Sequence, residues 1–290
     1  METGIQVGTA GVITGEFPAG AHRGRRAARH PERHVPRLRC EDGREGGVWM
    51  ANSGRRERLR AQMSAEVRSA ARDIIRRQGV EALTLAEIAR RVEVTPAALY
   101  HHFQGGLPEI ACRVAEDIVD HLVAELQSAS DACPADNFAM RLIEPVRSLR
   151  RWAITHQPEF NLLFGSPSTA AGDAHGELTN AWVRRLAAVW GPIFVELWTE
   201  RTYPVLAEED MDPRLRQQMQ DYRIDTGVDL PPGAMVVMLN CWRSLYGQIA
   251  MEVFGHFAPL FSDQEPMFEL LMLDLMRGLD LQDQYRPPVR

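Results

Sequence analysis

The chain has 290 residues and a formal net charge of −6; 45% of its residues are hydrophobic and 25% are charged. This composition supports one large or two smaller apolar cores, and it excludes a fully disordered chain and a disulfide miniprotein. Its apolar stretches are far shorter than the ~20 residues that a bilayer requires. Residues 1–20 lack the basic start and apolar run of a signal peptide. We therefore expect a cytoplasmic protein without membrane contact.

The charge is distributed unevenly along the chain. Residues 1–103 carry 18 Arg against 12 Asp and Glu, whereas residues 104–290 carry 15 Arg against 27 acids. A basic N-terminal part joined to an acidic remainder indicates that only the first part meets a polyanion. The four cysteines are scattered without CxxC spacing, so we expect reduced thiols rather than disulfides, and neither a metal site nor a cofactor. They are Cys40, Cys112, Cys133 and Cys241.

Residues 1–54 are rich in Gly, Arg, His and Pro and show no apolar period. We interpret them as a disordered extension, or as untranslated sequence before a later start at Met50 or Met63. The pattern then changes, and Ser64 is predicted to cap a helix that Gly79 ends as a left-handed C-cap. The apolar stripe of that helix is Val67, Ala70, Ala71, Ile74 and Ile75.

Two short helices follow in close succession. Thr84 and Glu87 form a predicted capping box at the start of a helix that ends near residue 92. Thr95 followed by Pro96 is a strong start signal for the next helix, which continues to Phe103. These two helices and the one before them are the components of a helix-turn-helix domain over residues 55–106.

The remainder, residues 107–290, shows helical periodicity without strand-like alternation. Helices are predicted at residues 108–127, 137–156, 158–164, 177–207 with a break at 191–192, 232–254 and 266–279. The predicted fold class is therefore all-α, with an N-terminal helix-turn-helix domain and a C-terminal helical domain for ligand binding and dimerisation.

In a helix-turn-helix, the second helix lies in the major groove of duplex DNA. Ala97, Ala98 and His101 project outward near the start of that helix, where methyl groups can meet thymine and an imidazole can bind a purine N7. Phosphate contacts are expected from six further residues. They are Thr84, Thr95, Tyr100 and His102, together with Arg55 and Arg56 of a basic arm.

Each of these assignments has a structural alternative. Tyr100 could be ordinary core packing, and the arginine cluster could be a solvated face. A metal site at His101 and His102 is disfavoured because adjacent helical residues point about 100° apart. Beside a helix-turn-helix, contact with DNA is the favoured interpretation of the arginines. The cluster consists of Arg55, Arg56, Arg58 and Arg60.

Residues 66–103, EVRSAARDIIRRQGVEALTLAEIARRVEVTPAALYHHF, closely resemble the DNA-binding domain of TetR-family transcriptional regulators. The resemblance is carried by the Ala-Ala pair, Gly79, LTLAEIARRV and above all TPAALYHHF. It implies a homodimeric regulator, usually a repressor, that a small ligand releases from its operator. It also implies that Tyr100 and His102 contact phosphates while Leu99 and Phe103 pack the domain. From the docking geometry of helix-turn-helix dimers we expect a palindromic operator.

Two positions depart from the family pattern. Glu93 stands in the turn where the family usually has Gly, and such a position favours positive φ. Gly106 stands where the family commonly has a Lys that contacts phosphate. Together these departures predict weaker or differently distributed contacts with the DNA backbone.

The segments HQPEFNLLFGSP and CWRSLYGQIAMEVFG resemble a C-terminal effector domain of the WHG type, found in part of the same family. The helix at residues 232–254 is apolar on nearly all sides, so we expect it to form a dimer face with residues 266–279. The alternative is a core helix within one chain. The predicted dimer contacts are Trp242, Leu245, Ile249, Phe268, Leu271 and Leu275.

Aromatic residues of the C-terminal domain are candidates for lining a pocket for a lipophilic effector, although aromatic residues at helical spacing are more often core. The candidates are Trp152, His156, Phe160, Phe164, Trp182, Trp198 and Tyr203. Coupling to the DNA-binding domain is expected through the helix at residues 108–127.

Two other classes of protein are alternatives. The chain contains no nucleophile elbow, Gly-rich phosphate loop, HExxH motif or zinc-ligand spacing, and residues 208–210 are interpreted as a solvated acidic loop, so an enzyme is disfavoured. A helical module of the same fold that has lost specific DNA binding is supported only by Glu93 and Gly106. The sequence favours a DNA-binding regulator.

Overall fold

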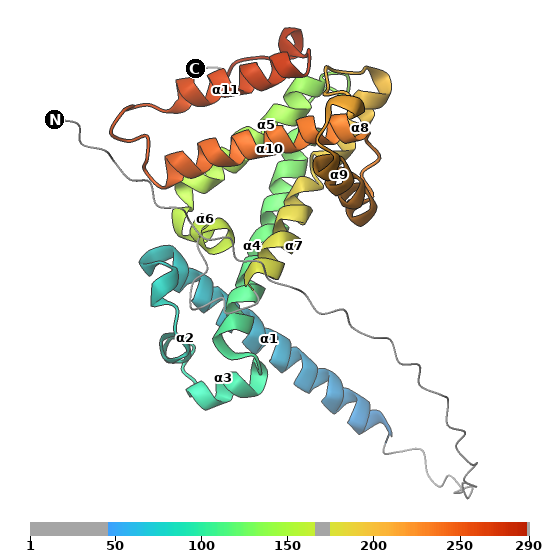
Figure 1. Cartoon of the computed structure of the whole chain (residues 1–290). Coiled ribbons are helices and arrows are strands. Elements are labelled where there is room, and N and C mark those ends of the chain that lie inside the picture. The colour runs from blue at the N-terminus through green and yellow to red at the C-terminus, as the bar shows by residue number, and fades with distance from the viewer. Residues whose placement is uncertain (1–45, 166–174, 289–290) are drawn as a thin grey trace, which may run out of the picture. The chain divides into compact units, whose positions relative to one another are not determined.

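The computed structural model describes residues 46–165 and 175–288, in which all regular secondary structure is helical (Figure 1). The all-α prediction is therefore confirmed. Residues 50–290 form one unit, which contains the helix-turn-helix and the C-terminal domain. The α-helices are α1 (Gly46–Gln78), α2 (Leu85–Arg91), α3 (Pro96–His102), α4 (Gly106–Asp131), α5 (Phe138–Thr155), α6 (Gln157–Phe164), α7 (His175–Ala187), α8 (Gly191–Glu200), α9 (Pro213–Thr226), α10 (Pro232–Val253) and α11 (Glu265–Gly278).

The helix-turn-helix forms as the sequence predicts, around a core that all three of its helices supply. Val67 and Ile74 of α1 are fully buried, as are Ile88 of α2 and Leu99 of α3. Phe103, directly after α3, is also buried, so the packing roles of Leu99 and Phe103 are confirmed. This small core fixes the angle at which α3 is presented to solvent.

The start of α1 differs from the prediction. Ser64 does not begin the helix but lies inside it, where its Oγ accepts a hydrogen bond from Arg68 Nη1 at 2.9 Å. A helix already begins at Gly46, inside the predicted extension, while residues 1–45 lie outside the described residues. Gly79 does end the helix with a positive φ of +88°, but its ψ of 169° is not that of a left-handed helical cap.

The C-terminal domain contains one helix that the sequence analysis missed. The helix predicted to reach residue 207 ends at Glu200, and an extended segment follows, because Pro204 disfavours helix for the residue before it. The missed helix, α9, begins at Pro213 with Asp212 Oδ1 accepting from Arg214 N at 2.8 Å, and Gly227 ends it at φ +70°. Only Met219 of α9 is buried, so the helix has no apolar stripe to reveal it.

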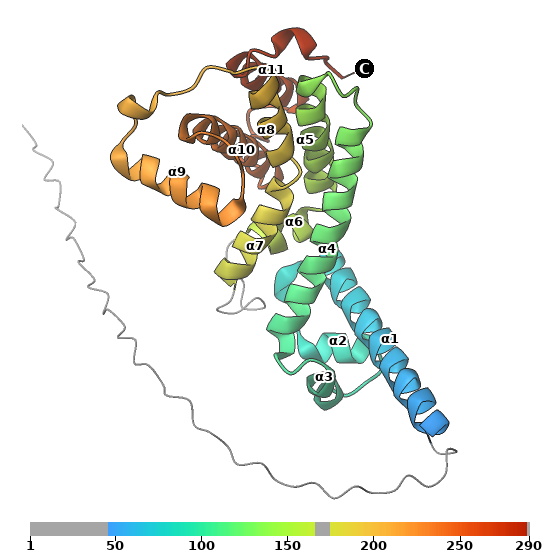
Figure 2. The same ribbon diagram turned by 90° about the vertical axis from the view of Figure 1, so that its right-hand side faces the viewer.

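Helix α4 runs from the helix-turn-helix into the C-terminal domain, where it packs along α5 (Figure 2). Its buried face is continuous from Ile110 to Leu126, so one rigid element belongs to both parts of the molecule. None of the described helices is long and apolar enough to span a membrane.

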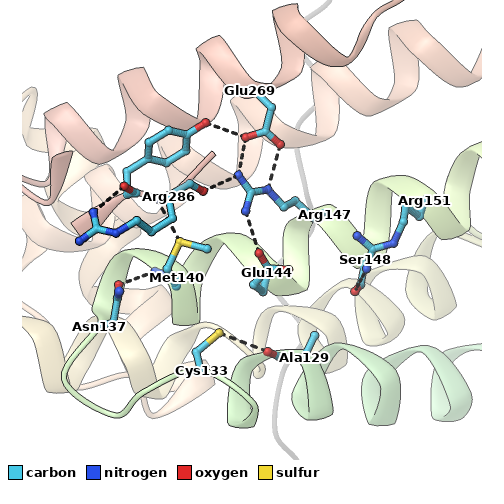
Figure 3. Close-up of polar contacts among 11 residues, drawn as sticks. Ala129, Cys133, Asn137, Met140, Glu144, Arg147, Ser148, Arg151, Glu269 and Arg286 are labelled. Carbon is cyan, nitrogen blue, oxygen red and sulfur yellow. Dashed lines mark hydrogen bonds and ion pairs between the residues drawn. The ribbon is translucent and has the colours of Figure 1, made fainter. Parts of the chain in front are cut away.

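A buried arginine joins α5 to α11 and to the C-terminal segment (Figure 3). Arg147 donates from Nε and Nη2 to Glu269 at 2.9 and 2.5 Å, and from Nη1 to Glu144 at 2.7 Å. It also donates to the carbonyl of Arg286 at 2.9 Å, while the hydroxyl of Tyr285 donates to Glu269 at 2.7 Å. Because the Arg147 guanidinium binds two carboxylates and a carbonyl at once, α11 is held against α5 in one orientation.

Candidate DNA-binding site and ligand cavity

The two helices of the DNA-reading unit begin at threonine caps. Thr95 Oγ1 accepts from Ala98 N at 3.2 Å with Pro96 in the first turn, and Thr84 Oγ1 accepts from Glu87 N at 3.2 Å. Both caps are therefore confirmed. The predicted capping box is only half formed, because the Glu87 carboxylate binds arginines instead of returning to Thr84. Both threonines are exposed, and each hydroxyl keeps its hydrogen for another acceptor.

Helix α3 exposes the residues predicted to meet DNA. Ala97, His101 and His102 are exposed, Tyr100 is 52% exposed, and Ala98 is half-buried. The exposed surface near the start of α3 is therefore small and polar, which suits insertion into the major groove. In the described part of the chain, no group of three or more His, Cys, Asp and Glu residues is placed to hold a metal ion.

The turn between α2 and α3 carries the expected strain. Glu93 has a φ of +56°, in the left-handed region that favours glycine. The turn is closed by a hydrogen bond from Val94 N to the carbonyl of Ala89 at 3.0 Å. The prediction of positive φ at this position is confirmed, and the exposed carboxylate of Glu93 lies next to the start of the recognition helix.

The cations of α2 are matched by acids of the same domain. Arg90 lies 2.7 Å and Arg91 3.1 Å from Glu87 Oε1, and Arg91 also lies 2.8 Å from Asp73. The hydrogen bonds of Arg90 and then Arg91 lower the pKa of Glu87 to about 2. The pKa of Asp73 is likewise lowered, chiefly by its hydrogen bond with Arg77.

The start of α4 is shaped by Gly106 and Glu109. Gly106 has a φ of +64°, and a Cβ atom there would lie 3.0 Å from Cε1 of Tyr100. Glu109 Oε2 accepts a hydrogen bond from the backbone N–H of Gly105 at 2.9 Å. The absence of a side chain at Gly106, where the family commonly has Lys, thus leaves room for the ring of Tyr100.

The basic arm lies on α1, ahead of the helix-turn-helix core. Arg55 is exposed there, while the side chain of Arg56 lies outside the described residues. The other predicted DNA contacts all belong to the compact unit of α2 and α3.

An apolar cavity of about 340 Å³ lies between α7, α8, α9 and α10 of the C-terminal domain. A neighbouring cavity of about 620 Å³ shares Arg184, Ala187, Tyr222 and Met238 with it. The first cavity is lined by Val183, Arg184, Ala187, Trp190, Phe194, Tyr222, Met238, Leu239, Cys241, Trp242 and Leu245.

None of the seven aromatic residues predicted for a pocket lines this cavity. Trp152, Phe160, Trp182 and Tyr203 are buried in the core, as the alternative interpretation has it. His156 stacks on Trp152, Phe164 packs on Phe160, and Trp198 packs on Tyr203. The sequence prediction missed the cavity because α9, which forms one of its walls, was itself missed. Trp190 and Trp242, whose rings lie 6.2 Å apart at this cavity, are far apart in the sequence, and no local pattern pairs them.

The residues predicted for a dimer face are only partly available. Leu245, Ile249 and Phe268 are buried within the chain. Trp242, Leu271 and Leu275 remain partly exposed. The apolar residues that α10, α11 and the segment between them do expose are Met251, Phe254, Leu260, Phe261, Met267 and Leu270.

The fold and the exposed recognition helix define a helix-turn-helix regulator, and comparison with known proteins agrees. The profile described as "Bacterial regulatory proteins, tetR family" matches residues 67–105, and that described as "Tetracyclin repressor-like, C-terminal domain" matches residues 142–275. The chain belongs to the TetR family of transcriptional regulators. It is therefore a DNA-binding regulator and not an enzyme.

Curated relatives are described as helix-turn-helix transcriptional regulators. The chain is 24% identical over 221 residues to the HTH-type transcriptional regulators Rv1816 of Mycobacterium tuberculosis and Mb1846 of Mycobacterium bovis, covering 74% of this chain and 92% of each relative. The crystal structure of regulatory protein SCO4313 aligns with a TM-score of 0.58 and 24% identity, over 76% of this chain and 98% of that chain, which supports the fold. Membership of the family implies binding of DNA and of a small-molecule effector, and dimerisation.

Proposed function

We propose that this chain is a homodimeric repressor that binds a palindromic operator and is released from it by a small lipophilic ligand, acting in the cytoplasm. The observation that carries the proposal is the capped, solvent-exposed start of α3, with Thr95 at its cap and Ala97 and His101 on its open face. Base contacts are proposed for Ala97, Ala98 and His101. Phosphate contacts are proposed for Thr84, Thr95, Tyr100, His102, Arg55 and Arg56.

The proposed ligand site is the cavity between α7, α8, α9 and α10. Its volume of about 340 Å³ falls within the range of small-molecule sites, and its walls are largely aromatic and aliphatic. Polar groups are few and include Tyr222 and Arg184. This distribution suits a lipophilic molecule with one polar end.

The proposed dimer contact keeps α10 and α11 but moves to the residues that these helices expose. Met251 and Phe254 at the end of α10, and Met267 and Leu270 of α11, expose apolar side chains that a second copy could cover. A Cβ atom at Gly247 would meet nothing within 4 Å inside the chain, so this position leaves room for close approach of a second helix. The length of α4 then carries a ligand-dependent shift of the C-terminal domain to the spacing of the two recognition helices.

The first experiment is a gel shift of the purified protein against DNA flanking its own gene, with excess competitor DNA. A specific shift with a protected palindrome is expected. Replacing Ala187, which lines both cavities, by Trp is expected to leave the shift intact and abolish its response to ligand. A footprint without two-fold symmetry would contradict the dimer.

A second function is favoured by the exposed Glu93 and by the Glu109 cap at the start of α4. A module that has lost specific DNA binding would give no shift at low salt while remaining dimeric. That outcome would indicate that the protein acts through protein or ligand binding instead of specific DNA binding.

A further inference from the structure

The helix-turn-helix carries no surplus of cations where it faces DNA. Residues 84–109 contain two Arg and three Glu. Both arginines are bound by acids, Arg90 by Glu87, and Arg91 by Glu87 and Asp73. Duplex DNA carries one negative charge per ~1.7 Å of its axis, so tight binding requires cations from another part of the chain.

The start of α4 does not supply them. Helix N-termini favour phosphate groups because their backbone N–H groups are free. Here the carboxylate of Glu109 already accepts the N–H of Gly105 at 2.9 Å, and Gly106 has no side chain to offer. An anionic group of the protein itself thus occupies a position that suits phosphate.

The N-terminal half of α1 has the opposite character. Arg55, Arg58 and Arg60 are exposed, and none of them takes part in an ion pair within the described residues. Glu57 is the one acid of residues 55–62. Arg55 and Arg58 lie three residues apart on one helix face, where like charges repel each other unless an anion lies between them.

The position of this segment relative to α3 is fixed by the helix itself. The first fully buried residue of α1 is Val67, which belongs to the core that also holds α3. At 1.5 Å per residue, Arg55 lies about 18 Å ahead of Val67 along the axis. Figures 1 and 2 show the start of α1 running out beyond α2 and α3.

We propose that the exposed arginines near the start of α1, Arg55, Arg58 and Arg60, bind phosphates of duplex DNA outside the segment that α3 reads, and supply most of the salt-dependent affinity. This rests on the proposed DNA-binding function. It goes beyond the predicted contact of the arginine cluster with DNA, because it assigns that cluster to phosphates outside the segment that α3 reads and makes it the main source of salt dependence. The cations are carried on a helix continuous with the domain core, so they contact DNA without first ordering a loop.

The test compares the full-length protein with the triple variant Arg55→Ala, Arg58→Ala, Arg60→Ala. Fluorescence anisotropy titrations use a random-sequence duplex and an operator duplex selected from a random pool, between about 50 and 200 mM KCl. Losing three phosphate contacts lowers the magnitude of the slope of log K against log salt by roughly 2.7 per bound protomer, at about 0.9 per contact. The DNase footprint is expected to shorten at its outer flanks, with the selected sequence unchanged.

The matched control is the triple lysine variant at the same positions, which keeps the charge and is expected to keep the slope. The alanine variant should fold, because these side chains are exposed and alanine favours helix; circular dichroism checks this. If the unmodified protein bound neither duplex, the proposed function and this inference would both be overturned. If it bound and the alanine variant kept its slope and footprint, or the lysine variant lost slope equally, this inference alone would be overturned.

Discussion

Arg72 and Glu159 join the helix-turn-helix to the C-terminal domain. Nε of Arg72, on α1, lies 2.6 Å from Oε1 of Glu159, on α6, and the Glu159 side chain is fully buried. Its second oxygen, Oε2, has no hydrogen-bond partner and lies 3.9 Å from Nε2 of His156. Among the described residues, the side-chain hydrogen bond to this buried carboxylate therefore comes from Arg72 of the DNA-binding domain.

Removing this cation is expected to destabilise the protein. Arg72→Met leaves a buried, unpaired carboxylate, and the free energy of unfolding should fall by about 3 kcal/mol in urea titrations. Arg68 provides a matched control one turn away on α1, since its pair with Asp117 at 2.6 Å is partly exposed on both sides. Arg68→Met should cost no more than about 1 kcal/mol. Adding Glu159→Gln to Arg72→Met should recover part of the loss, and failure to recover any would show that the buried charge is not the cause.

Gly106 packs against the ring of Tyr100, so a methyl group added at Gly106 should displace that ring. Gly106→Ala introduces a Cβ atom 3.0 Å from Cε1 of the ring at a φ of +64°, so the ring must move and stability should fall by about 1 kcal/mol. DNA affinity should fall as well, and the loss should be non-additive with Tyr100→Ala in a double-mutant cycle. Additive losses of affinity would show that Gly106→Ala does not act through Tyr100.

Substitutions at Tyr100 and His101 are expected to change DNA binding in different ways. Tyr100→Phe removes a proposed phosphate contact and should weaken binding to all sequences, whereas His101→Ala removes a proposed base contact and should relax preference at one position of each half-site. Selection from random duplex pools measures both changes. The same change in preference for both variants would refute this division of roles.

The ion pairs of Glu87 with Arg90 and Arg91 on α2 predict a pH dependence of stability. The pKa of Glu87 is lowered from 4.5 to about 2 by Arg90 and Arg91, so the folded state binds its proton less readily than the unfolded chain. Its contribution to stability is present above pH 4.5 and is lost as the pH falls towards 2. Urea titrations between pH 2 and pH 4.5 should show that the free energy of unfolding depends less steeply on pH in Glu87→Gln than in the unmodified protein. An unchanged dependence would show that other carboxylates account for it.

The parts of the molecule that the sequence predicted are those with local signals. The caps at Thr84 and Thr95 and the positive φ at Glu93 each follow from residues within a few positions of one another. The cavity could not be found in this way, because its wall includes α9, whose single buried residue gives no periodic pattern. The buried and exposed sides of α10 could not be told apart from the sequence for a related reason. The helix α10 is apolar on most sides, and its packing on α5, α8 and α9 decides that Leu245 and Ile249 are buried while Met251 is exposed.

Glu93 offers a test of whether the turn between α2 and α3 lowers the stability of the protein and its affinity for DNA. Glu93→Gly removes both the strain of a non-glycine residue at φ +56° and a carboxylate next to α3. The free energy of unfolding should rise by about 1 kcal/mol, because glycine adopts a positive φ without the steric cost that a Cβ atom brings. DNA affinity should rise too, through loss of repulsion with phosphate. Glu93→Gln separates the two effects: it keeps the strain and removes the charge, so it should raise affinity and leave stability nearly unchanged. If glutamine gave no gain in affinity while glycine did, the geometry of the turn and not its charge would limit DNA binding.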